Sequence, residues 1–496
     1  MLGALGSLGL LAACSRPAHP QTSPTTSAAG VTPQGRPASG RLTVQDWART
    51  RGTPFYIAHR GAGDVYPEHS MQGYRAAVEA GAKCLEVSVN RTSDGVLICM
   101  HDLTYNRTTN GTGLIAAQPS SVLARTWIRQ PQLGPAWVQP PLIPVPRLES
   151  VLAEFGGKVV LCLEAKDDAA YPAMMSLVAK AGLLDSVIVK GYYSSNRIAQ
   201  AKAAGLPVFA YLSPADMTES TISKAAGRLG ASDYLVLPSD NGDYVTYYPP
   251  ALISAAKAHG VPLMVYPIHR RADAAYYFDL GVSGAVTSDY RYTTTNTAAA
   301  TSDHWASKRI SSGEKPKMPD SKSLAGAWTS VNELTLGAEG DRQFLTLGQL
   351  CPIASADSQY RVRFSATWNR LPADLTSTVS LAFCHPDDRY YEDGLSLSEG
   401  YHATMSPNGT LRIYRHGAGV AEELLGEVRT PAVSAGQWVT LQLDVSPQSL
   451  IWTRTDLPVA GPVVVHDSAV RGGYLSVGRS GAEAAAAVSL REFSVG

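Results

Sequence analysis

Charged and imidazole side chains stand at the ends of several short apolar runs in the first half of the chain. His59 and Arg60 directly follow one such run, Glu86 lies within the next, and His101 follows a third. If these runs are neighbouring strands, their polar side chains meet at one edge of a sheet. Gathering carboxylates, imidazoles and cations there costs several kcal/mol unless a site uses them. The pattern therefore predicts a functional site for ionic, titratable chemistry.

An acidic and a basic residue, Glu164 and Lys166, end a further apolar run, Val159–Leu163. Strand alternation places both side chains on the same side, where they would also fit a simple ion pair. A single histidine at a strand end is likewise more often a structural residue than a catalytic one. The grouping of all these residues, and not any one of them, favours a functional site.

Apolar runs alternate with alanine-rich stretches from Phe55 to about Arg291. Stretches such as Ser70–Ala80 and Asn196–Ala204 show helical spacing of their apolar residues. Eight strand–helix units over roughly 240 residues predict a TIM (β/α)8 barrel, with an open doubly wound sheet as the rival α/β fold. The additional run Leu97–Met100 is interpreted as a local excursion from the barrel. The expected strands are Phe55–Ala58, Cys84–Val89, Val159–Leu163, Val187–Lys190, Val208–Tyr211, Tyr234–Leu237, Leu263–Tyr266 and Gly284–Thr287.

Taken in order along the chain, the motifs around these residues resemble the signature of the glycerophosphodiester phosphodiesterase family. The similarity is strong from about Phe55 to Asp168 and fades beyond, although Gly281 to Asp289 is similar to the family's last strand. The matching segments are Ile57-Ala58-His59-Arg60-Gly61, Pro67-Glu68, Gly81-Ala82 with Glu86, Thr92 with Asp94-Gly95, His101-Asp102, Arg107-Thr108-Thr109, Gly111-Thr112-Gly113, Ile143 through Glu149, and Leu163-Glu164-Ala165-Lys166.

The resemblance implies a TIM barrel that hydrolyses a glycerophosphodiester, or a related small polar phosphodiester, to a phosphomonoester and an alcohol. His59 and His101 would be the acid/base pair. One would help to deprotonate the attacking hydroxyl or water, and the other would protonate the leaving alkoxide. Arg60 suits a forked contact to phosphate oxygens, and Lys166 would supply a second positive charge.

The resemblance also implies one divalent cation, Ca²⁺ or Mg²⁺, that polarises the phosphoryl group. Glu86 and Glu164 match metal ligands of the family, and Glu68 matches a further site carboxylate that reaches the metal or the substrate. The family's second strand usually reads Glu-x-Asp, whereas Ser88 stands here in place of the Asp. Ser88 is therefore expected at a metal-ligand position with one charge fewer, and affinity for a hard cation falls with ligand charge.

Two classes of function stay open at this point. The first is an active phosphodiesterase. The second is a catalytically weakened cell-surface protein that binds phosphodiester or glycan groups, an alternative motivated by the missing carboxylate. Lys plus Arg equals Asp plus Glu at 42 each, so the overall charge gives no attraction to nucleic acid.

The amino terminus predicts an exported lipoprotein. Residues 1–14 combine the apolar run Leu2–Ala13, which is too short to span a bilayer, with Leu11-Ala12-Ala13-Cys14, which resembles a bacterial lipobox. Lipidated Cys14 would anchor the mature chain at the extracytoplasmic face of the cell membrane. Residues 15–48, rich in Ser, Pro and Thr, would form a flexible tether. The competing interpretation is a buried apolar segment beside an incidental cysteine.

The sequence pattern changes after the barrel, which is expected to span residues 49–295. A stretch rich in Thr, Ser, Ala, Lys and Pro at residues 296–322 predicts a linker. Residues 323–496 contain short, often alternating runs separated by Gly, Pro, Asn or Asp. These runs predict an all-β sandwich of the jelly-roll, concanavalin-like kind.

The predicted sandwich offers candidates for carbohydrate binding. Trp368, Trp438 and Trp452 would stack on sugars if they are exposed, whereas core packing is the competing role. Cys351 and Cys384 would form a disulfide in an exported protein, with two buried thiols as the alternative. The cysteines inside the apolar runs of the barrel are interpreted as small core residues; these are Cys84, Cys99 and Cys162.

Overall fold

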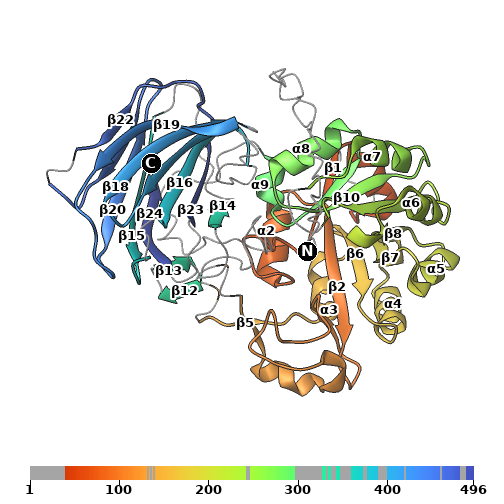
Figure 1. The fold of residues 1–496 in the computed structure, drawn as a ribbon. Coiled ribbons are helices and arrows are strands. Elements are labelled where there is room, and N and C mark those ends of the chain that lie inside the picture. Colours follow the sequence, from red (N-terminus) through yellow and green to blue (C-terminus); the bar gives the residue numbers. More distant parts are fainter. Residues whose placement is uncertain are drawn as a thin grey trace, which may run out of the picture.

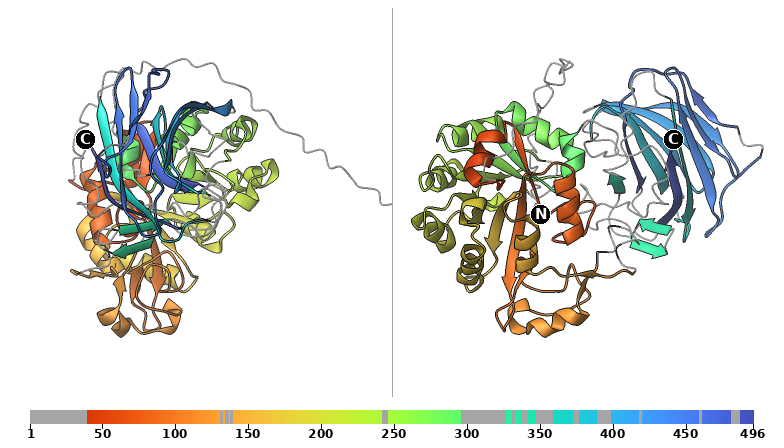
Figure 2. Two further views of the ribbon diagram at one scale, coloured as in Figure 1. Left: turned by 60° about the vertical axis from the view of Figure 1, so that its left-hand side comes forward. Right: turned by 180° about the vertical axis from the view of Figure 1, so that it is seen from behind.

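The computed structural model of the chain contains two domains (Figure 1; Figure 2). It describes residues 40–130, 133, 137, 140–241, 246–295, 327–330, 333–336, 342–346, 359–372, 377–388, 399–417, 420–458, 461–480 and 487–496. The predicted signal peptide with Cys14, most of the predicted tether and the predicted linker lie outside these residues. Within them, every helix is too short or too polar to span a bilayer.

Eight parallel strands form a closed barrel in the first domain. They are β1 (Phe55–Ala58), β2 (Cys84–Arg91), β6 (Val160–Ala165), β7 (Val187–Tyr192), β8 (Val208–Tyr211), β9 (Tyr234–Pro238), β10 (Leu263–Ile268) and β11 (Gly284–Thr287). Each strand pairs with the next in this order, and β11 pairs with β1. The ring includes the pairing of β1 with β2 through Ala58 and Leu85. This closure confirms the predicted TIM barrel and excludes the open doubly wound sheet.

Helices cover the outside of the barrel (Figure 2). Several begin at a serine or threonine, because the side chains of Ser70, Ser195 and Thr218 accept backbone N–H groups that the first helical turn leaves unpaired. The helices are α1 (Val44–Thr50), α2 (Met71–Glu79), α3 (Leu148–Phe155), α4 (Ala170–Lys180), α5 (Asn196–Ala203), α6 (Glu219–Ala226), α7 (Pro250–Lys257), α8 (Arg271–Asp279) and α9 (Tyr290–Thr294).

Helix α1 begins before the expected start of the barrel domain at residue 49. Its apolar residues Val44 and Trp47 are buried in the cluster that fills the barrel interior. The ring of Trp47 packs edge-on against Phe55 of β1, with 5.4 Å between the ring centroids. The folded domain therefore includes the last residues of the segment predicted as tether, because these two side chains have apolar surface to bury.

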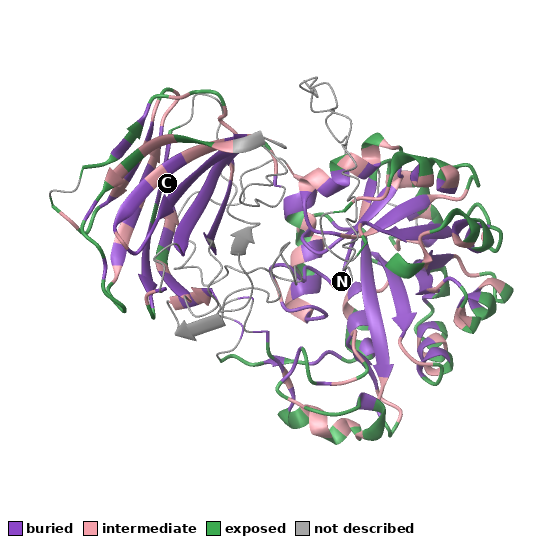
Figure 3. Cartoon of the chain, in the orientation of Figure 1, coloured by how far each residue is buried: buried purple, intermediate pink, exposed green. Residues whose placement is uncertain are grey.

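Strand alternation decides which residues reach the barrel interior. In β2, Leu85, Val87 and Val89 pack against the surrounding helices. Glu86 and Ser88 therefore face inward. Figure 3 shows the barrel strands buried along most of their length. Any polar residue on the inner face of a strand is thus enclosed by the protein.

Small and apolar residues fill the rest of the barrel interior. Cys84, Cys162 and Ile188 lie together in this cluster. Cys99 is buried on the other side, against the helices. The interpretation of these three cysteines as core residues is confirmed.

A short excursion follows β2. Strand β3 (Leu97–Cys99) pairs antiparallel with β2, and Val89 lies opposite Cys99. Beyond it, β4 (Trp127–Ile128) pairs with β5 (Ile143–Pro144). The side-chain amide of Asn90 donates to the backbone carbonyls of Met100 (2.8 Å) and Asp102 (2.9 Å). Asn90 thereby fixes the backbone that carries the predicted site residue His101.

The second domain consists of two antiparallel sheets. One holds β12 (Ala327–Ser330), β13 (Glu333–Leu336), β15 (Tyr360–Trp368), β20 (Val439–Val445), β21 (Leu450–Arg454), β22 (Val463–Val465) and β24 (Val488–Val495). The other holds β14 (Arg342–Thr346), β16 (Thr378–His385), β17 (Gly400–Met405), β18 (Thr410–Gly417), β19 (Val420–Arg429) and β23 (Tyr474–Ser480). Side chains of both sheets share one apolar core. The predicted β-sandwich is confirmed, and its jelly-roll, concanavalin-like character stays a prediction.

The tryptophans of the sandwich differ in exposure. Trp368 and Trp452 are fully buried in its core, so core packing is their role. Trp452 also donates to the backbone carbonyl of Thr404 on the other sheet (3.0 Å). Trp438 is half-buried and is the remaining sugar-stacking candidate of the three. Cys384 is a buried free thiol whose sulfur lies 3.4 Å from the hydroxyl of Tyr360, so the predicted disulfide is not formed; Cys351 lies outside the described residues.

A carboxylate of the sandwich caps a helix of the barrel. Asp388, which follows β16, accepts the backbone N–H groups of Arg271 (2.6 Å) and Ala272 (2.9 Å) in the first turn of α8. It also accepts the hydroxyl of Tyr292 in α9 (2.7 Å). The residue that precedes α8 makes no side-chain cap of its own. A negative charge at a helix amino terminus is favourable, so this contact joins the two domains.

We expect Asp388→Ala to lower the free energy of unfolding by about 1–3 kcal/mol, because it leaves buried N–H and O–H donors without an acceptor. Asp388→Asn keeps one carbonyl oxygen as an acceptor, so its free energy of unfolding should fall by less. Urea unfolding followed by circular dichroism measures both variants. Equal stability of Asp388→Ala and the wild type would show that this contact does not hold the domains together.

Candidate functional site

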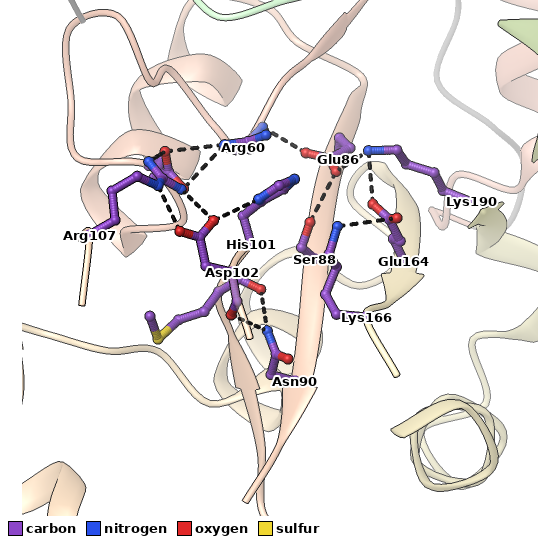
Figure 4. A network of polar contacts seen from close by, with 12 residues as sticks. Arg60, Glu86, Ser88, Asn90, His101, Asp102, Arg107, Glu164, Lys166 and Lys190 are labelled. Carbon is purple, nitrogen blue, oxygen red and sulfur yellow. Dashed lines mark hydrogen bonds and ion pairs between the residues drawn. The ribbon is translucent and has the colours of Figure 1, made fainter. Parts of the chain in front are cut away.

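The predicted site residues meet where the barrel strands end (Figure 4). Glu86 and Ser88 come from β2, and Glu164 comes from the end of β6. Lys190 enters from β7, and His101 follows β3. Carboxyl ends of strands are where TIM barrels carry their reacting groups. The fold thus gathers residues that are far apart in the sequence; Lys190 and Glu86, for example, are 104 positions apart.

Two carboxylates and two ammonium groups form the centre of the site. The Nζ atom of Lys190 lies 2.8 Å from Oε1 of Glu86 and 3.0 Å from Oε2 of Glu164. The Nζ atom of Lys166 lies 3.3 Å from Oε1 of Glu164. The side chain of Glu86 is 0% exposed, and that of Lys190 is 6% exposed. These charges are therefore neutralised by one another and not by water.

The pKa values in this cluster favour the charged forms of its carboxyls. Burial alone would raise the pKa of Glu86 and of Glu164. The neighbouring ammonium of Lys190 outweighs burial, so the pKa of Glu86 lies well below its usual value and that of Glu164 falls to about 2. The two carboxylates in turn raise the pKa of Lys190 against the opposing effect of burial. At neutral pH the three groups form a buried ionic triad.

Further donors complete the surroundings of Glu86. The backbone N–H of Arg60 donates to its Oε2 (2.9 Å), and the hydroxyl of Ser88 donates to its Oε1 (3.3 Å). Arg60 has a φ of 51°, which is uncommon for a residue other than glycine. This conformation lets one residue direct its amide at Glu86 while its guanidinium reaches toward Glu68, with an NH1–Oε2 distance of 3.2 Å.

Glu68 belongs to a cluster of arginines. Both of its oxygens accept N–H groups of Arg107 at 2.8 Å, in addition to the contact with Arg60. Arg107 also binds both oxygens of Asp102 at 2.8 Å. Glu68 was predicted to reach a metal or the substrate; in the structure it orients the two guanidinium groups that border the site.

His101 is held by the carboxylate next to it in the sequence. Its Nδ1 lies 2.9 Å from Oδ1 of Asp102. Burial, followed by the charge of Arg60, lowers the pKa of His101 from 6.5 to about 4. The imidazole is therefore neutral at pH 7, donates its Nδ1–H to Asp102, and presents Nε2 as a proton acceptor.

His59 is fixed by the last strand of the barrel. Its Nδ1 lies 2.9 Å from the hydroxyl of Ser288, just after β11. Its backbone N–H donates to the carbonyl of Thr287 (2.8 Å). His59 directly precedes Arg60, whose backbone N–H donates to Glu86, so it lies beside the buried triad. Both predicted histidines thus border one site from two sides.

Sequence reasoning did not assign Lys190 to the site. A signal was present, because Lys190 ends the predicted strand Val187–Lys190 and shares the inner face with Ile188. Arg107, Asp102 and Ser288 lay within quoted motifs but received no role. Arg107 contacts Glu68, and Ser288 contacts His59, from distant parts of the sequence, whereas Asp102 pairs with its neighbour His101. The motifs alone do not identify these contacts.

Asp102→Asn is expected to lower kcat/KM by up to about 10²-fold, the low end of the range for loss of an acid or base, because the imidazole itself remains. The hydrogen bond that Asp102 accepts from His101 favours the charged form of His101. Its loss should therefore move the acid limb of the kcat/KM profile from near pH 4 to lower pH. A profile that keeps its acid limb in this variant would exclude His101 as the group that titrates.

The site lies at the mouth of a closed parallel barrel and combines two histidines, two arginines and a buried carboxylate–ammonium cluster. These features define a TIM-barrel enzyme suited to an anionic substrate. Residues 59–290 match the model of the "Glycerophosphoryl diester phosphodiesterase family". This part of the chain is similar to that family, and the similarity identifies the protein as a phosphodiesterase enzyme.

Individual proteins are similar to this chain over different lengths. A glycerophosphodiester phosphodiesterase of Bacillus subtilis strain 168 is 28% identical over 278 residues, which cover 52% of this chain and 89% of that protein. One from Caldanaerobacter subterraneus is 44% identical over 59 residues, which cover 12% of this chain and 24% of that protein. The crystal structure of glycerophosphodiester phosphodiesterase from Agrobacterium tumefaciens has a TM-score of 0.38 and 22% identity, covering 48% of this chain and 97% of that chain.

Proposed function

We propose that the protein hydrolyses glycerophosphodiesters, or a related small polar phosphodiester, by acid–base catalysis at His59 and His101. Water attacks phosphorus and gives its proton to Nε2 of His101. The new P–O bond forms as the bond to the alkoxide breaks, and His59 donates a proton to the alkoxide. The products are a phosphomonoester and an alcohol, and proton exchange with solvent restores both histidines.

The observation that carries this proposal is the pairing of His101 with Asp102 beside two guanidinium groups. The low pKa of His101 provides a neutral base at pH 7, and Asp102 stabilises the imidazolium that forms. Arg60 and Lys166 supply positive charge for the phosphate oxygens. The side chain of Lys166 is 14% exposed and that of Lys190 is 6% exposed, so Lys166 is the more accessible of the two ammonium groups in the site.

Glu68 was a further candidate ligand of the divalent cation expected from the sequence, but it pairs with Arg60 and Arg107. The remaining candidate ligands are Glu86, Glu164 and Ser88. Their oxygens are already in contact with the ammonium groups of Lys190 and Lys166 or, for Ser88, with Glu86 itself. Over the described parts of the chain, no group of three or more His, Cys, Asp or Glu side chains is arranged to hold a metal ion. These residues do not fit a divalent cation, and no step of the proposed reaction passes through one.

A release assay tests the proposed function. The enzyme is incubated with glycerophosphocholine and with several other glycerophosphodiesters, with and without added Ca²⁺ or Mg²⁺, and the phosphomonoester is measured. We expect turnover of at least one headgroup. Binding of these diesters without turnover would favour the alternative of a catalytically weakened surface-binding protein that recognises phosphodiester or glycan groups.

We also propose that Cys14 is lipidated and that the chain is exported to the extracytoplasmic face of a bacterial membrane. The support is the lipobox-like Leu11-Ala12-Ala13-Cys14 and the Ser- and Pro-rich segment that follows it. Labelled palmitate should be incorporated by the wild type and not by Cys14→Ala in a bacterial host. Incorporation by both would refute the assignment of Cys14.

A further inference from the structure

We infer that Lys190 permanently takes the place of the divalent cation expected between Glu86 and Glu164, so that this enzyme works without one. The inference rests on the proposed phosphodiester hydrolysis and concerns how the same site obtains its positive charge. Lys190 is then a positioning residue. It contacts both carboxylates, and through them it keeps Arg60 and Lys166 in place.

The position of the ammonium is the first argument. Its nitrogen lies 2.8 Å from one carboxylate and 3.0 Å from the other, so it bridges the two side chains that match metal ligands. Ca²⁺ and Mg²⁺ would need to lie about 2.0–2.6 Å from the same oxygens. A cation and an ammonium cannot both bind between Glu86 and Glu164 at these distances.

The charge balance is the second argument. Glu86 and Glu164 carry two negative charges, and Lys190 and Lys166 carry two positive charges, so the cluster is neutral as it stands. A divalent cation would leave a buried excess of two positive charges, which is costly in an enclosed site. Ser88 adds no negative charge, because its neutral hydroxyl stands where the family usually has a carboxylate.

The saturation of the carboxylate oxygens is the third argument. Glu86 receives Ser88 and Lys190 on Oε1 and the amide of Arg60 on Oε2. Oε1 of Glu164 accepts the hydroxyl of Tyr211 (3.1 Å) and lies 3.3 Å from Nζ of Lys166, and its Oε2 lies 3.0 Å from Nζ of Lys190 without a hydrogen bond. A hard cation prefers six to eight oxygen ligands or an octahedron of them. Here each carboxylate oxygen already has a hydrogen-bond donor or an ammonium group within 3.3 Å.

The surroundings of Lys190 keep its side chain in place. Its ammonium lies 5.4 Å from the ring centroid of Tyr211 and 6.0 Å from that of Phe209, both on the adjacent strand β8. Cations are attracted to the faces of aromatic rings at such distances. Withdrawal of Lys190 would leave two buried carboxylates side by side, with only Lys166 to balance them. The geometry therefore favours a fixed internal cation over an exchangeable one.

Calorimetric titration of the full chain, after treatment with EDTA, tests this inference. We expect no binding of Ca²⁺ or Mg²⁺ to the wild type at concentrations up to about 10⁻³ M, the weak end of protein calcium sites. Turnover of the glycerophosphodiester substrate should be the same with EDTA and with either cation. The double variant Lys190→Gln, Ser88→Asp restores three carboxylates without the bridging ammonium, so it should bind one Ca²⁺ and melt at a higher temperature when Ca²⁺ is added.

Lys202→Gln is the matched control. Lys202 lies in α5, the helix after β7, and its ammonium also pairs with a mostly buried carboxylate, that of Asp233. This variant loses a Lys–Asp ion pair outside the barrel mouth and should match the wild type in metal binding and EDTA resistance.

Stoichiometric Ca²⁺ or Mg²⁺ binding by the wild type that Glu164→Gln abolishes would overturn the inference, even if the double variant fails to fold. Loss of turnover with EDTA that either cation restores would overturn it as well. Failure of the proposed function is distinguishable, because an inactive wild type would show no turnover with or without metal, whereas the calorimetric titration still decides whether the cradle binds a cation.

Discussion

Replacement of either His59 or His101 by alanine is expected to lower kcat/KM for a glycerophosphodiester by roughly 10²–10⁴, the usual contribution of an acid or a base. Each ring is fixed at Nδ1, His101 by Asp102 and His59 by the hydroxyl of Ser288. Fixed rings are suited to transfer protons at defined positions. Since the two groups act in one concerted exchange, the double variant should be little worse than the poorer single variant.

His259→Ala is the control for these variants. His259 is exposed just after α7, at the opposite end of the barrel from the site, because the helices run back along the strands. Its replacement should leave kcat/KM unchanged. Wild-type rates in both His59→Ala and His101→Ala would remove these residues from the mechanism.

Glu86→Gln is expected to lower the free energy of unfolding by about 3–5 kcal/mol, because removal of one partner of a buried ionic group leaves a charge without compensation. The neutral amide would leave Lys190 and Lys166 with Glu164 as their one carboxylate. Thermal and urea unfolding measure the loss. The matched control is Glu154→Gln, whose partner Arg75 lies 2.6 Å away in an exposed ion pair worth about 0–1 kcal/mol.

The same cluster predicts how stability depends on pH. The pKa of Glu164 is lowered from 4.5 to about 2, so its ionisation stabilises the fold above pH 4.5. That contribution is lost as the pH falls through 4.5 toward 2. The pKa of Glu86 is lowered in the same direction. Unfolding measured from pH 6 to pH 3 should show a steeper loss for the wild type than for Glu86→Gln, and equal slopes would contradict the assigned pairing.

Local patterns in the sequence were sufficient to predict the TIM barrel. The bounds of β1, β8 and β11 agree with the predicted strands, because each is a compact apolar run that ends in a turn. The order of the motifs along the chain also identified the resemblance to the phosphodiesterase family. The bounds of helices and of the domain were less predictable where tertiary packing decides them. Helix α1 is an example, because burial of Trp47 against the barrel stabilises it.

The centre of the site depends on the register between neighbouring barrel strands, which could not be predicted from the sequence. Ser88 lies opposite Glu164 across β2 and β6, and Leu163 lies opposite Val189 across β6 and β7. These pairings bring Lys190 beside both carboxylates. A resemblance to a family assigns ligand positions from conserved motifs, whereas Lys190 lies on a strand outside the matching segments. The contact of Asp388 with α8 and α9 could not be predicted either, because it lies outside the matching segments and joins residues of two domains.

Hydrolysis of the phosphodiester at this site can be observed directly by ³¹P NMR. Glycerophosphocholine is mixed with the full-length enzyme after EDTA treatment, with His101→Ala as the comparison. We expect the wild type to convert the diester resonance into a phosphomonoester resonance and the variant to do so at least about 10²-fold more slowly. A diester resonance that persists with the wild type, with this and other headgroups and with or without added cation, would contradict it.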